Sequence, residues 1–417
     1  MAGINCGILH NARPLTAEQV EELERRAFES NETFVYLDEN SKLCFTGSCD
    51  PNVIKDLAWH NTYELSTKES TFTKKVYAKR GIKTYSQTGV LTKQAANDSW
   101  VQKFSEGLEF TSNGDGTCRV SGIGICTDTD VILPERSPDG ELVTAIDNSA
   151  FQDNPDIESL LIPDSVTCIG YSAIRHCSKL IRIMIGNGVT SIGDYAFYWC
   201  ENLKNITIGS GLTSLGQRVF ESCYNLTSII IDTNNQNYKS IDGNLYSKDG
   251  TKLIQYAIGQ KASSFTIPSS VTNIGDDAFL YCNSLTGITI PDSVTSIGDS
   301  AFNSCESLTG IIIPNSVTSI SDKAFFNCSS LTSINIPASV TSIGNAAFQY
   351  CTRLTSITIP DSVTSIGDSA FKYCNSLTSI TFEGTVSSWG SVVLGAQWNV
   401  NSSRVTYVQC TDGVVSI

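Results

Sequence analysis

The sequence predicts a repeat solenoid of short β-strands and tight turns, preceded by a small α+β domain at the N-terminus. Three observations support this prediction. A 23-residue unit recurs through most of the 417-residue chain, the net charge of −14 falls entirely on residues 106–417, and residues 1–105 carry no trace of the unit. The hydrophobic content of 41% is enough for a buried core, which excludes a chain that is disordered throughout.

The predicted regions follow from where the repeat starts, is interrupted and ends. The units at 285–307 (LTGITIPDSVTSIGDSAFNSCES) and 354–376 (LTSITIPDSVTSIGDSAFKYCNS) are nearly identical, and two similar units lie between them. Phe220 and Phe279 are 59 residues apart instead of 23, so an insert lengthens the array at about 232–262. We expect four regions: an α+β anchoring or assembly module at 1–105, a β-rich cap at 106–145, repeats at 146–382 and a C-terminal cap at 383–417.

Within one unit, the alternation of apolar and polar residues predicts a short strand. In LTSITI, Leu354, Ile357 and Ile359 face inward while Thr and Ser between them face solvent. The following SVTSIG offers a second extended segment, and DSAFKYC fits one helical or 3-10 turn with Phe371 and Cys374 on one face. One unit alone cannot bury this apolar face, but stacked copies form a continuous interior.

A cysteine recurs at one position of the unit. Its copies are Cys177, Cys200, Cys223, Cys282, Cys305, Cys328, Cys351 and Cys374. A regular column suits small buried thiols better than disulfides, so we expect reduced core residues. The disulfide status of the remaining cysteines stays open: Cys6, Cys44, Cys49, Cys118, Cys126, Cys168 and Cys410.

The pattern LxxIxIPxSVTSIGxxAFxxC over residues 106–417 resembles the BspA-like leucine-rich repeats, a 23-residue class of bacterial and protist surface proteins. This resemblance implies a right-handed solenoid with a parallel sheet along one side, and attachment to host proteins or other cells. Residues 234–260 also resemble a longer unit of that family, here a β-hairpin followed by a strand. Ile174 in place of Phe, and Gly186 and Gly209 in place of Pro, depart from the pattern, so the early coils are expected to be less regular.

The segments at both ends of the array are predicted to cover its stacking faces. Residues 106–145 indicate β-structure with a hairpin around an NGDG turn, in which Cys118 and Cys126 either pair or stay free. At the other end, Trp389 and Trp398 are expected as apolar plugs over the last coil, with a carbohydrate-stacking pair as the alternative.

The N-terminal module resembles no family that we recognise. We expect a helix at 16–31, a hairpin at 34–47, a second short helix at 51–60 and a strand pair at 71–92 that turns near Gly81. By analogy with other tethered repeat arrays, this module is expected to attach the array to a particle, a partner or a second copy of the chain.

Charge and motifs argue against several classes of function. The acidic array repels phosphate backbones and anionic lipid, so we expect neither nucleic-acid binding nor membrane insertion, and no run of about 18 apolar residues predicts a spanning helix. His10, His60 and His176 lie in no metal-binding motif, and no phosphate-binding glycine loop occurs. We therefore predict that the protein is not an enzyme and uses no cofactor or metal.

Asp276, Asp299 and Asp322 occupy equivalent positions in three consecutive units. Stacked coils would place them about 5 Å apart. Such a carboxylate column could recruit Ca²⁺, but we expect these side chains to cap their turns and to point outward into water.

The outward strand positions are the candidate binding surface. In the regular units they form a row of small side chains, namely Thr289, Ile312, Asn335, Thr358 and Thr381. In the irregular coils the candidates are Arg182, Met184, Thr207 and Ile230, together with the insert. A broad flat face of this kind suits proteins or glycans, although Thr and Ser are also common on any exposed strand.

The leading hypothesis is a non-enzymatic recognition or adhesion protein whose acidic solenoid binds a protein or glycan on a host or neighbouring cell. The start of the chain shows no signal peptide, so the favoured surface location needs a removed leader, another export route or assembly on a particle. The second hypothesis is a virion component, a receptor-binding fibre anchored by residues 1–105, which would also allow homo-oligomer or particle assembly. The third is an intracellular protein-interaction scaffold.

Overall fold

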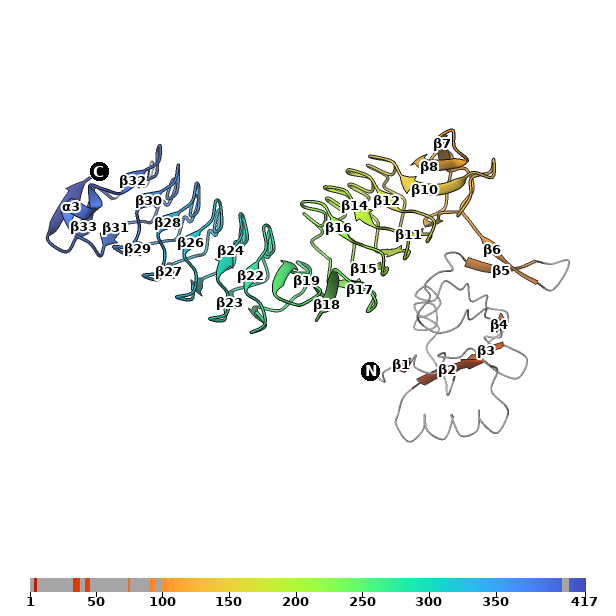
Figure 1. Ribbon diagram of the computed structural model, residues 1–417, viewed down its shortest axis with the longest axis horizontal. Coiled ribbons are helices and arrows are strands. Elements are labelled where there is room, and N and C mark those ends of the chain that lie inside the picture. Colours follow the sequence, from red (N-terminus) through yellow and green to blue (C-terminus); the bar gives the residue numbers. More distant parts are fainter. Residues whose placement is uncertain are drawn as a thin grey trace.

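The computed structural model describes residues 4–5, 33–37, 42–45, 74–75, 90–94, 99–399 and 405–417, with side chains from Phe104 onward within these ranges. The repeats form an elongated solenoid of stacked coils (Figure 1). Each regular coil contributes one short strand to each of two faces, and strands of successive coils pair in parallel. The predicted repeat solenoid is confirmed.

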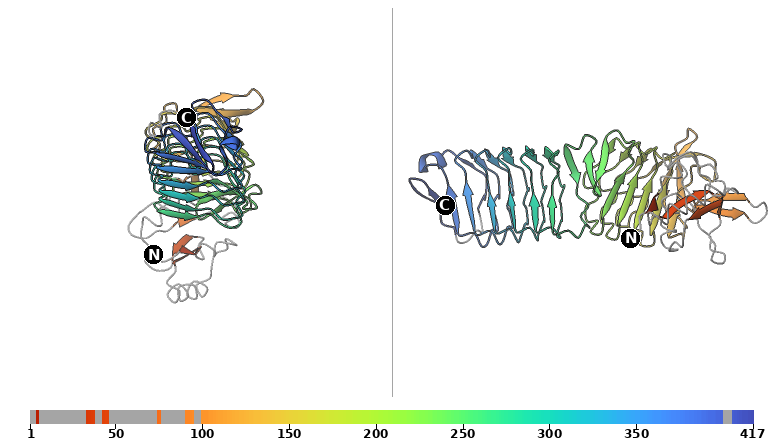
Figure 2. Two further views of the ribbon diagram at one scale, coloured as in Figure 1. Left: turned by 90° about the vertical axis from the view of Figure 1, so that its left-hand side faces the viewer. Right: turned by 90° about the horizontal axis from the view of Figure 1, so that it is seen from below.

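The first face carries the strand that opens each unit, and its strands lie side by side in the right-hand view of Figure 2. Before the hairpin it contains β9 (Asp130–Ile132), β11 (Ser159–Ile162), β13 (Arg182–Ile185), β15 (Asn205–Ile208) and β17 (Ser228–Ile231). After the hairpin it contains β21 (Ser264–Thr266), β23 (Gly287–Thr289), β25 (Gly310–Ile312), β27 (Ser333–Asn335), β29 (Ser356–Ile359), β31 (Ser379–Phe382) and β33 (Tyr407–Cys410). Leu354, Ile357 and Ile359 are buried as predicted.

The second face carries the shorter strand of each unit. Before the hairpin it contains β8 (Thr117–Gly122), β10 (Leu142–Ile146), β12 (Cys168–Ile169), β14 (Ser191–Ile192) and β16 (Ser214–Leu215). After the hairpin it contains β22 (Asn273–Ile274), β24 (Ser296–Ile297), β26 (Ser319–Ile320), β28 (Ser342–Ile343), β30 (Ser365–Ile366) and β32 (Val393–Leu394). In the regular units of both faces the pairing register advances by one 23-residue unit, as in Ser342 with Ser365 and Ser356 with Ser379.

Within residues 1–105 the structure describes short strands. β1 (Ile4–Asn5), β2 (Thr33–Leu37), β3 (Lys42–Phe45) and β4 (Lys74–Lys75) form one sheet, and β5 (Val90–Gln94) pairs with β6 (Ser99–Lys103). Antiparallel pairing of β2 with β3 confirms the hairpin predicted at 34–47. In the strand pair predicted at 71–92, the described residues pair elsewhere, β4 with β3 and β5 with β6. The rest of that prediction, including the turn near Gly81, lies outside the described residues. The helices predicted at 16–31 and 51–60 lie outside the described residues.

The turn after each second strand is not helical, contrary to the expectation for DSAFKYC. Ser369 and Tyr373 have left-handed backbones, with φ of 57° and 63°, and a right-handed helix cannot continue through either. The same two positions are left-handed in every described unit from Ser149 to Tyr373. The turn is held instead by the next coil, as where the Phe348 N–H donates to the Ala370 carbonyl at 2.8 Å.

A stack of phenylalanines and a column of thiols fill the interior. Ring centroids lie 5.1–5.4 Å apart along Phe279, Phe302, Phe325, Phe348 and Phe371. The Cys351 thiol donates to the Phe325 carbonyl at 3.2 Å, and the other unit cysteines from Cys177 to Cys374 are likewise buried and free. Burial raises the pKa of Cys223 and Cys374 to about 12, so these thiols stay protonated. The prediction of reduced core cysteines is confirmed.

Aspartate and asparagine side chains link successive turns. Asp276 Oδ1 accepts the Asp299 backbone N–H at 2.9 Å, and Asp299 Oδ1 accepts the Asp322 N–H at 3.2 Å. Asn345 serves equally well one unit later, where its Oδ1 accepts the Asp368 N–H at 2.8 Å. We call this series (Asp276, Asp299, Asp322, Asn345, Asp368) the Asx ladder. Each member bonds to the next coil rather than capping its own turn, which corrects the expectation.

The insert forms the predicted hairpin and following strand. β18 (Tyr238–Ile241) and β19 (Asn244–Ser247) are antiparallel, and β20 (Lys252–Gln255) pairs with β19 on one side and β22 on the other. Adjacent residues of β19 belong to different cores: Leu245 packs with residues back to Leu108, and Tyr246 with residues as far as Cys410. The hairpin thus separates an N-terminal half (108–245) from a C-terminal half (246–410), on either side of β18 and β19 in Figure 1.

Both ends of the array are covered. β7 (Glu109–Ser112) pairs with β8 around the predicted NGDG turn. At the C-terminal end, α3 (Val386–Trp389) follows β31, and β34 (Gly413–Ser416) pairs antiparallel with β33. Trp389 and Trp398 are buried, and the Trp398 ring lies edge-on to Phe371 with centroids 6.2 Å apart. The two tryptophans therefore act as plugs, which leaves no open ring faces for the alternative carbohydrate-stacking pair.

Candidate recognition surface

In the C-terminal half, the predicted row of outward strand residues lies on the first face. Thr289, Ile312, Asn335 and Thr358 are exposed, and Thr381 is half-buried. Strand register places Ile312 beside Asn335 and Thr358 beside Thr381. Ile312, at 74% exposure, is the largest apolar side chain of this row, so the row is mainly small and polar.

In the N-terminal half, Met184 is not a surface residue, which corrects its prediction as part of a binding face. It is only 5% exposed, because Phe104 packs against the cluster that it forms with Ile132 and Leu161. The Ser105 N–H donates to the Ile132 carbonyl at 2.9 Å and holds this segment against β9. The chain that enters the array therefore covers the outward side of the first coils.

The other candidates of the N-terminal half are partly accessible. Arg182 and Thr207 are half-buried, and Ile230 is exposed. Thr207 pairs with Met184 on one side and Ile230 on the other, so this row changes from covered to open toward the hairpin.

Aromatic side chains also gather on the turns of the N-terminal half. We define the aromatic surface as Tyr171, His176, Tyr195, Tyr198 and Trp199. Neighbouring rings lie 5.1–6.0 Å apart between centroids. Tyr171 is 51% exposed and Trp199 is 39% exposed, so these rings lie outside the core.

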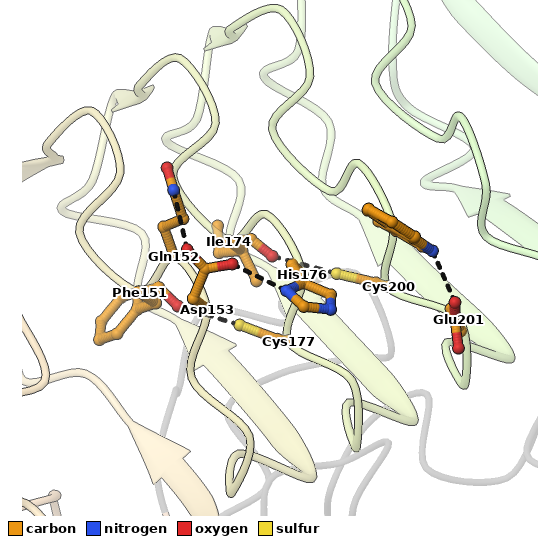
Figure 3. Close-up of polar contacts among 9 residues, drawn as sticks. Phe151, Gln152, Asp153, Ile174, His176, Cys177, Cys200 and Glu201 are labelled. Carbon is orange, nitrogen blue, oxygen red and sulfur yellow. Dashed lines mark hydrogen bonds and ion pairs between the residues drawn. The ribbon is translucent and has the colours of Figure 1, made fainter.

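Planar polar side chains contact two of these rings, and Figure 3 shows Gln152 and Asp153 beside His176. His176 Nδ1 lies 2.8 Å from Asp153 Oδ1, and Trp199 Nε1 donates to Glu201 Oε1 at 2.5 Å. Gln152 donates to Asp153 Oδ2 at 2.9 Å; this bond and the contact with His176 lower the pKa of Asp153. The aromatic surface therefore offers ring faces beside carboxylate, amide and imidazole groups.

Three rings of the aromatic surface sit on strained backbone. His176, Tyr195 and Trp199 have φ of 56°, 56° and 61°, a region that costs an L-residue roughly 1–2 kcal/mol and is most easily adopted by Gly or Asn. Asn327 occupies the Trp199 position of a later unit. The left-handed turn therefore does not require these rings, and it belongs to every described unit rather than to this surface alone.

A cleft of about 770 Å³ opens where the hairpin separates the halves. The turns after β16 and β22 form its walls, and residues of β18 and β20 also line it. Its polar and aromatic lining includes Tyr195, Arg218, Lys252, Gln255 and Asp277. The volume lies within the range of roughly 300–1,000 Å³ found for ligand sites. Tyr195 joins the cleft to the aromatic surface.

An ion-pair cluster bridges the two halves at this cleft. Arg218 Nε lies 3.2 Å from Asp277 Oδ2, and Arg218 Nη1 lies 3.7 Å from Glu221 Oε2. Burial raises the pKa of both Glu221 and Asp277, although the guanidinium opposes this effect. The Arg218 guanidinium therefore offsets part of the cost of burying these two carboxylates.

The sequence analysis missed the aromatic surface, but the signal was present. YAFYWC at 195–200 places large rings around the buried Phe197, where the later unit at 300–305 has SAFNSC. Comparing turn positions between units, rather than strand positions alone, shows three large rings, Tyr195, Tyr198 and Trp199, in this one turn, although Tyr350 also occupies the Trp199 position of a later unit. Their clustering in space could not be read from the unit, because it depends on the left-handed turns.

The family follows from the repeats described above. The model of the BspA type leucine-rich repeat region matches residues 144–265 and 256–378, with six copies. The chain belongs to this BspA-type leucine-rich repeat family. The resemblance inferred from the repeat pattern is confirmed, and no curated protein matches the chain.

Solved structures also resemble this BspA-type protein. The pneumococcal vaccine antigen PcpA is 22% identical with a TM-score of 0.53, and the match covers 66% of this chain and 72% of PcpA. A leucine-rich cell surface protein from Faecalibacterium prausnitzii is 27% identical (TM-score 0.46, 72% and 99% covered), and a leucine-rich repeat protein from Eubacterium ventriosum is 20% identical (TM-score 0.47, 71% and 93% covered). The PcpA match supports the fold.

The part of the chain that the structure describes contains neither a candidate membrane-spanning helix nor a candidate metal site. There, no helix is both long and apolar enough to cross a bilayer. No group of three or more His, Cys, Asp or Glu side chains in the same ranges is placed to hold a metal ion. The aromatic surface and the adjoining cleft are therefore the features that a function has to explain.

Proposed function

We propose that this BspA-type leucine-rich repeat protein is a non-enzymatic adhesion protein that binds a protein or glycan on a host or neighbouring cell. The turns of its N-terminal half make the contact, and the more regular C-terminal half lengthens the array. Leucine-rich repeat arrays generally serve binding, because stacked units expose long continuous surfaces. The proposed location is accordingly a cell or particle surface.

The aromatic surface is the observation that carries this proposal. Tyr171 and Trp199 are exposed in a cluster, although the hydrophobic core of their units is complete without them. These rings add nothing to that core, whereas Trp and Tyr are among the residues that dominate the energetics of binding interfaces. A recognition role accounts for both facts.

The test uses the full-length chain coated on fluorescent beads. We expect the beads to adhere to human epithelial monolayers or to immobilised bacterial cells well above uncoated beads. The Trp199→Asn variant should lower adhesion about tenfold, which is the effect of removing an aromatic hot spot. Equal adhesion of coated and uncoated beads to every cell type would refute the proposed function.

Tyr350→Asn is the matched control. Tyr350 occupies the same unit position as Trp199, has a similar left-handed φ of 64° and is 38% exposed, but it lies in the C-terminal half. Its replacement should leave adhesion unchanged. Equal losses in both variants would move the binding surface away from the N-terminal half.

A further inference from the structure

We infer that the aromatic surface binds a neutral pyranose glycan, which would run along the array axis toward the cleft at the hairpin. This inference rests on the proposed adhesion function and names the class of its ligand. Four features of the described residues support it.

The first feature is the pairing of ring faces with planar polar groups. The C–H faces of pyranose rings pack on aromatic faces, while their hydroxyls bond to coplanar carboxylate, amide and imidazole groups. Trp199 lies beside His176, with ring centroids 5.1 Å apart, and both carry a carboxylate partner, Glu201 and Asp153 respectively. More than 40% of the His176 and Asp153 side chains is exposed, so hydroxyl groups can reach them.

The second feature is the absence of aliphatic groups from this cluster. Exposed aliphatic side chains such as Ile230 and Ile312 lie on strands of the first face, not among these rings. Centres of protein interfaces are desolvated and depleted of charge. Here the Arg175 guanidinium lies 5.2 Å from the centroid of the Tyr198 ring, and the Asp153 and Glu201 carboxylates contact His176 and Trp199 respectively. A wet, charged border of this kind suits a sugar better than a polypeptide.

The third feature is spacing. Tyr171 and His176 come from one turn, and Tyr195, Tyr198 and Trp199 come from the next. Between these two turns, the ring centroids of Tyr171 and Tyr195 lie 5.9 Å apart, and those of His176 and Trp199 lie 5.1 Å apart. Coils repeat at about 4.8 Å, which is close to the length of one hexopyranose in a linear oligosaccharide, roughly 5 Å. A chain along the array axis therefore meets one coil per sugar. Beyond Tyr195 it reaches the cleft, where Arg218 and Gln255 supply further hydrogen-bond donors.

The fourth feature is charge. Residues 106–417 carry the whole net charge of −14, and Asp153 and Glu201 lie beside the rings. Sialylated or sulfated sugars would be repelled by this field, whereas neutral sugars would not. The charge therefore selects a neutral glycan from among the possible sugars.

The experiment repeats the bead assay on cells whose surfaces have been treated. Mild periodate oxidises vicinal diols of sugars, sialidase removes terminal sialic acid, and trypsin removes surface polypeptide. We expect periodate to lower adhesion about tenfold, to the level of Trp199→Asn beads, and sialidase to leave it unchanged. The Tyr350→Asn beads should respond to each treatment as the native protein does.

The outcomes separate the inference from the function on which it rests. Adhesion that survives periodate but is lost after trypsin would identify a peptide ligand. A loss of adhesion after sialidase would identify an anionic sugar. Either result overturns the inference of a neutral glycan but remains consistent with the proposed adhesion function. Beads that adhere to no untreated cell overturn the proposed function itself. Because Asn327 already occupies the Trp199 position in another unit, Trp199→Asn is expected to fold, and an unchanged or higher Tm will establish that its loss of adhesion is not unfolding.

Discussion

The two halves of the solenoid share a backbone but differ in what their side chains do. The C-terminal half repeats Phe, Cys and the Asx ladder with little change, and its rings stack at 5.1–5.4 Å. In the N-terminal half Ile174 interrupts the phenylalanine stack, and Tyr171 and Gln217 interrupt the ladder position. The irregular half also carries the aromatic surface. In the function that we propose, the regular units provide length and the aromatic surface provides recognition.

The largest expected effect tests whether the halves are separate cooperative units. Phe325→Ala removes a fully buried ring from the stack and should cost about 3–5 kcal/mol. Because Leu245 and Tyr246 belong to different cores, this loss should be confined to the C-terminal half. Hydrogen exchange with mass spectrometry in increasing urea should show early deprotection of peptides from 246–410 only. Equal shifts in peptides from 108–245 would mean that the hairpin couples the two cores.

The second prediction compares the outward strand rows of the halves. Met184→Lys places a charge under Phe104 and should destabilise the N-terminal half by roughly 2 kcal/mol. Asn335→Lys, at an exposed position of the other row, should change stability by less than about 0.5 kcal/mol. Urea denaturation measures both. Similar effects of the two lysines would show that the segment around Phe104 does not cover β13 in solution.

The third prediction concerns the Asx ladder, which is continuous only in the C-terminal half. Asp299→Ala removes the acceptor of the Asp322 N–H and should cost about 1 kcal/mol. Asp299→Asn keeps an oxygen in place, as Asn345 does, and should stay within about 0.5 kcal/mol of the native protein. Chemical denaturation of the pair separates the hydrogen bond from the charge. A larger effect of Asn than of Ala would contradict a hydrogen-bonding role.

The smallest effect is expected at the ion-pair cluster between the halves. Burial raises the pKa of Glu221 in the folded protein above its value of about 4.3 in the unfolded chain. Protonation of Glu221 therefore stabilises the fold fully below the unfolded pKa, and this stabilisation is lost as the pH rises through the folded pKa. Glu221→Gln lacks this buried charge, and its Tm should exceed that of the native protein at pH 7 and approach it below pH 4. Thermal unfolding at several pH values measures the difference. The control is Glu158→Gln, because Glu158 is exposed. A lower Tm of Glu221→Gln at pH 7 would mean that the contact with Arg218 stabilises the fold by more than the burial of the carboxylate destabilises it.

The fold was largely predictable because one pattern is repeated many times. Alternation in LTSITI placed Leu354, Ile357 and Ile359 inside, and the spacing of Phe220 and Phe279 located the hairpin. The turn could not be predicted in the same way. DSAFKYC is compatible with a helix on its own, and only hydrogen bonds to the next coil select the left-handed residues.

The candidate site was less predictable, for two physical reasons. The burial of Met184 depends on Phe104, a contact 80 positions away in the chain that no periodicity encodes. The aromatic surface was visible as large residues around Phe197, but it forms only because rings from two successive coils meet on one side. Long-range packing therefore decides which outward residues remain available.

The near identity of the units at 285–307 and 354–376 gives the C-terminal half an adjustable length. Because each unit pairs in register with a neighbour of almost the same sequence, one unit can be gained or lost without creating a mismatched interface. Every such change moves the capped end by one strand spacing, about 4.8 Å, and leaves Tyr171, Trp199 and the cleft untouched. Under the proposed function, the length of the array and the specificity of its binding surface are therefore encoded in separate stretches of the chain and can diverge independently.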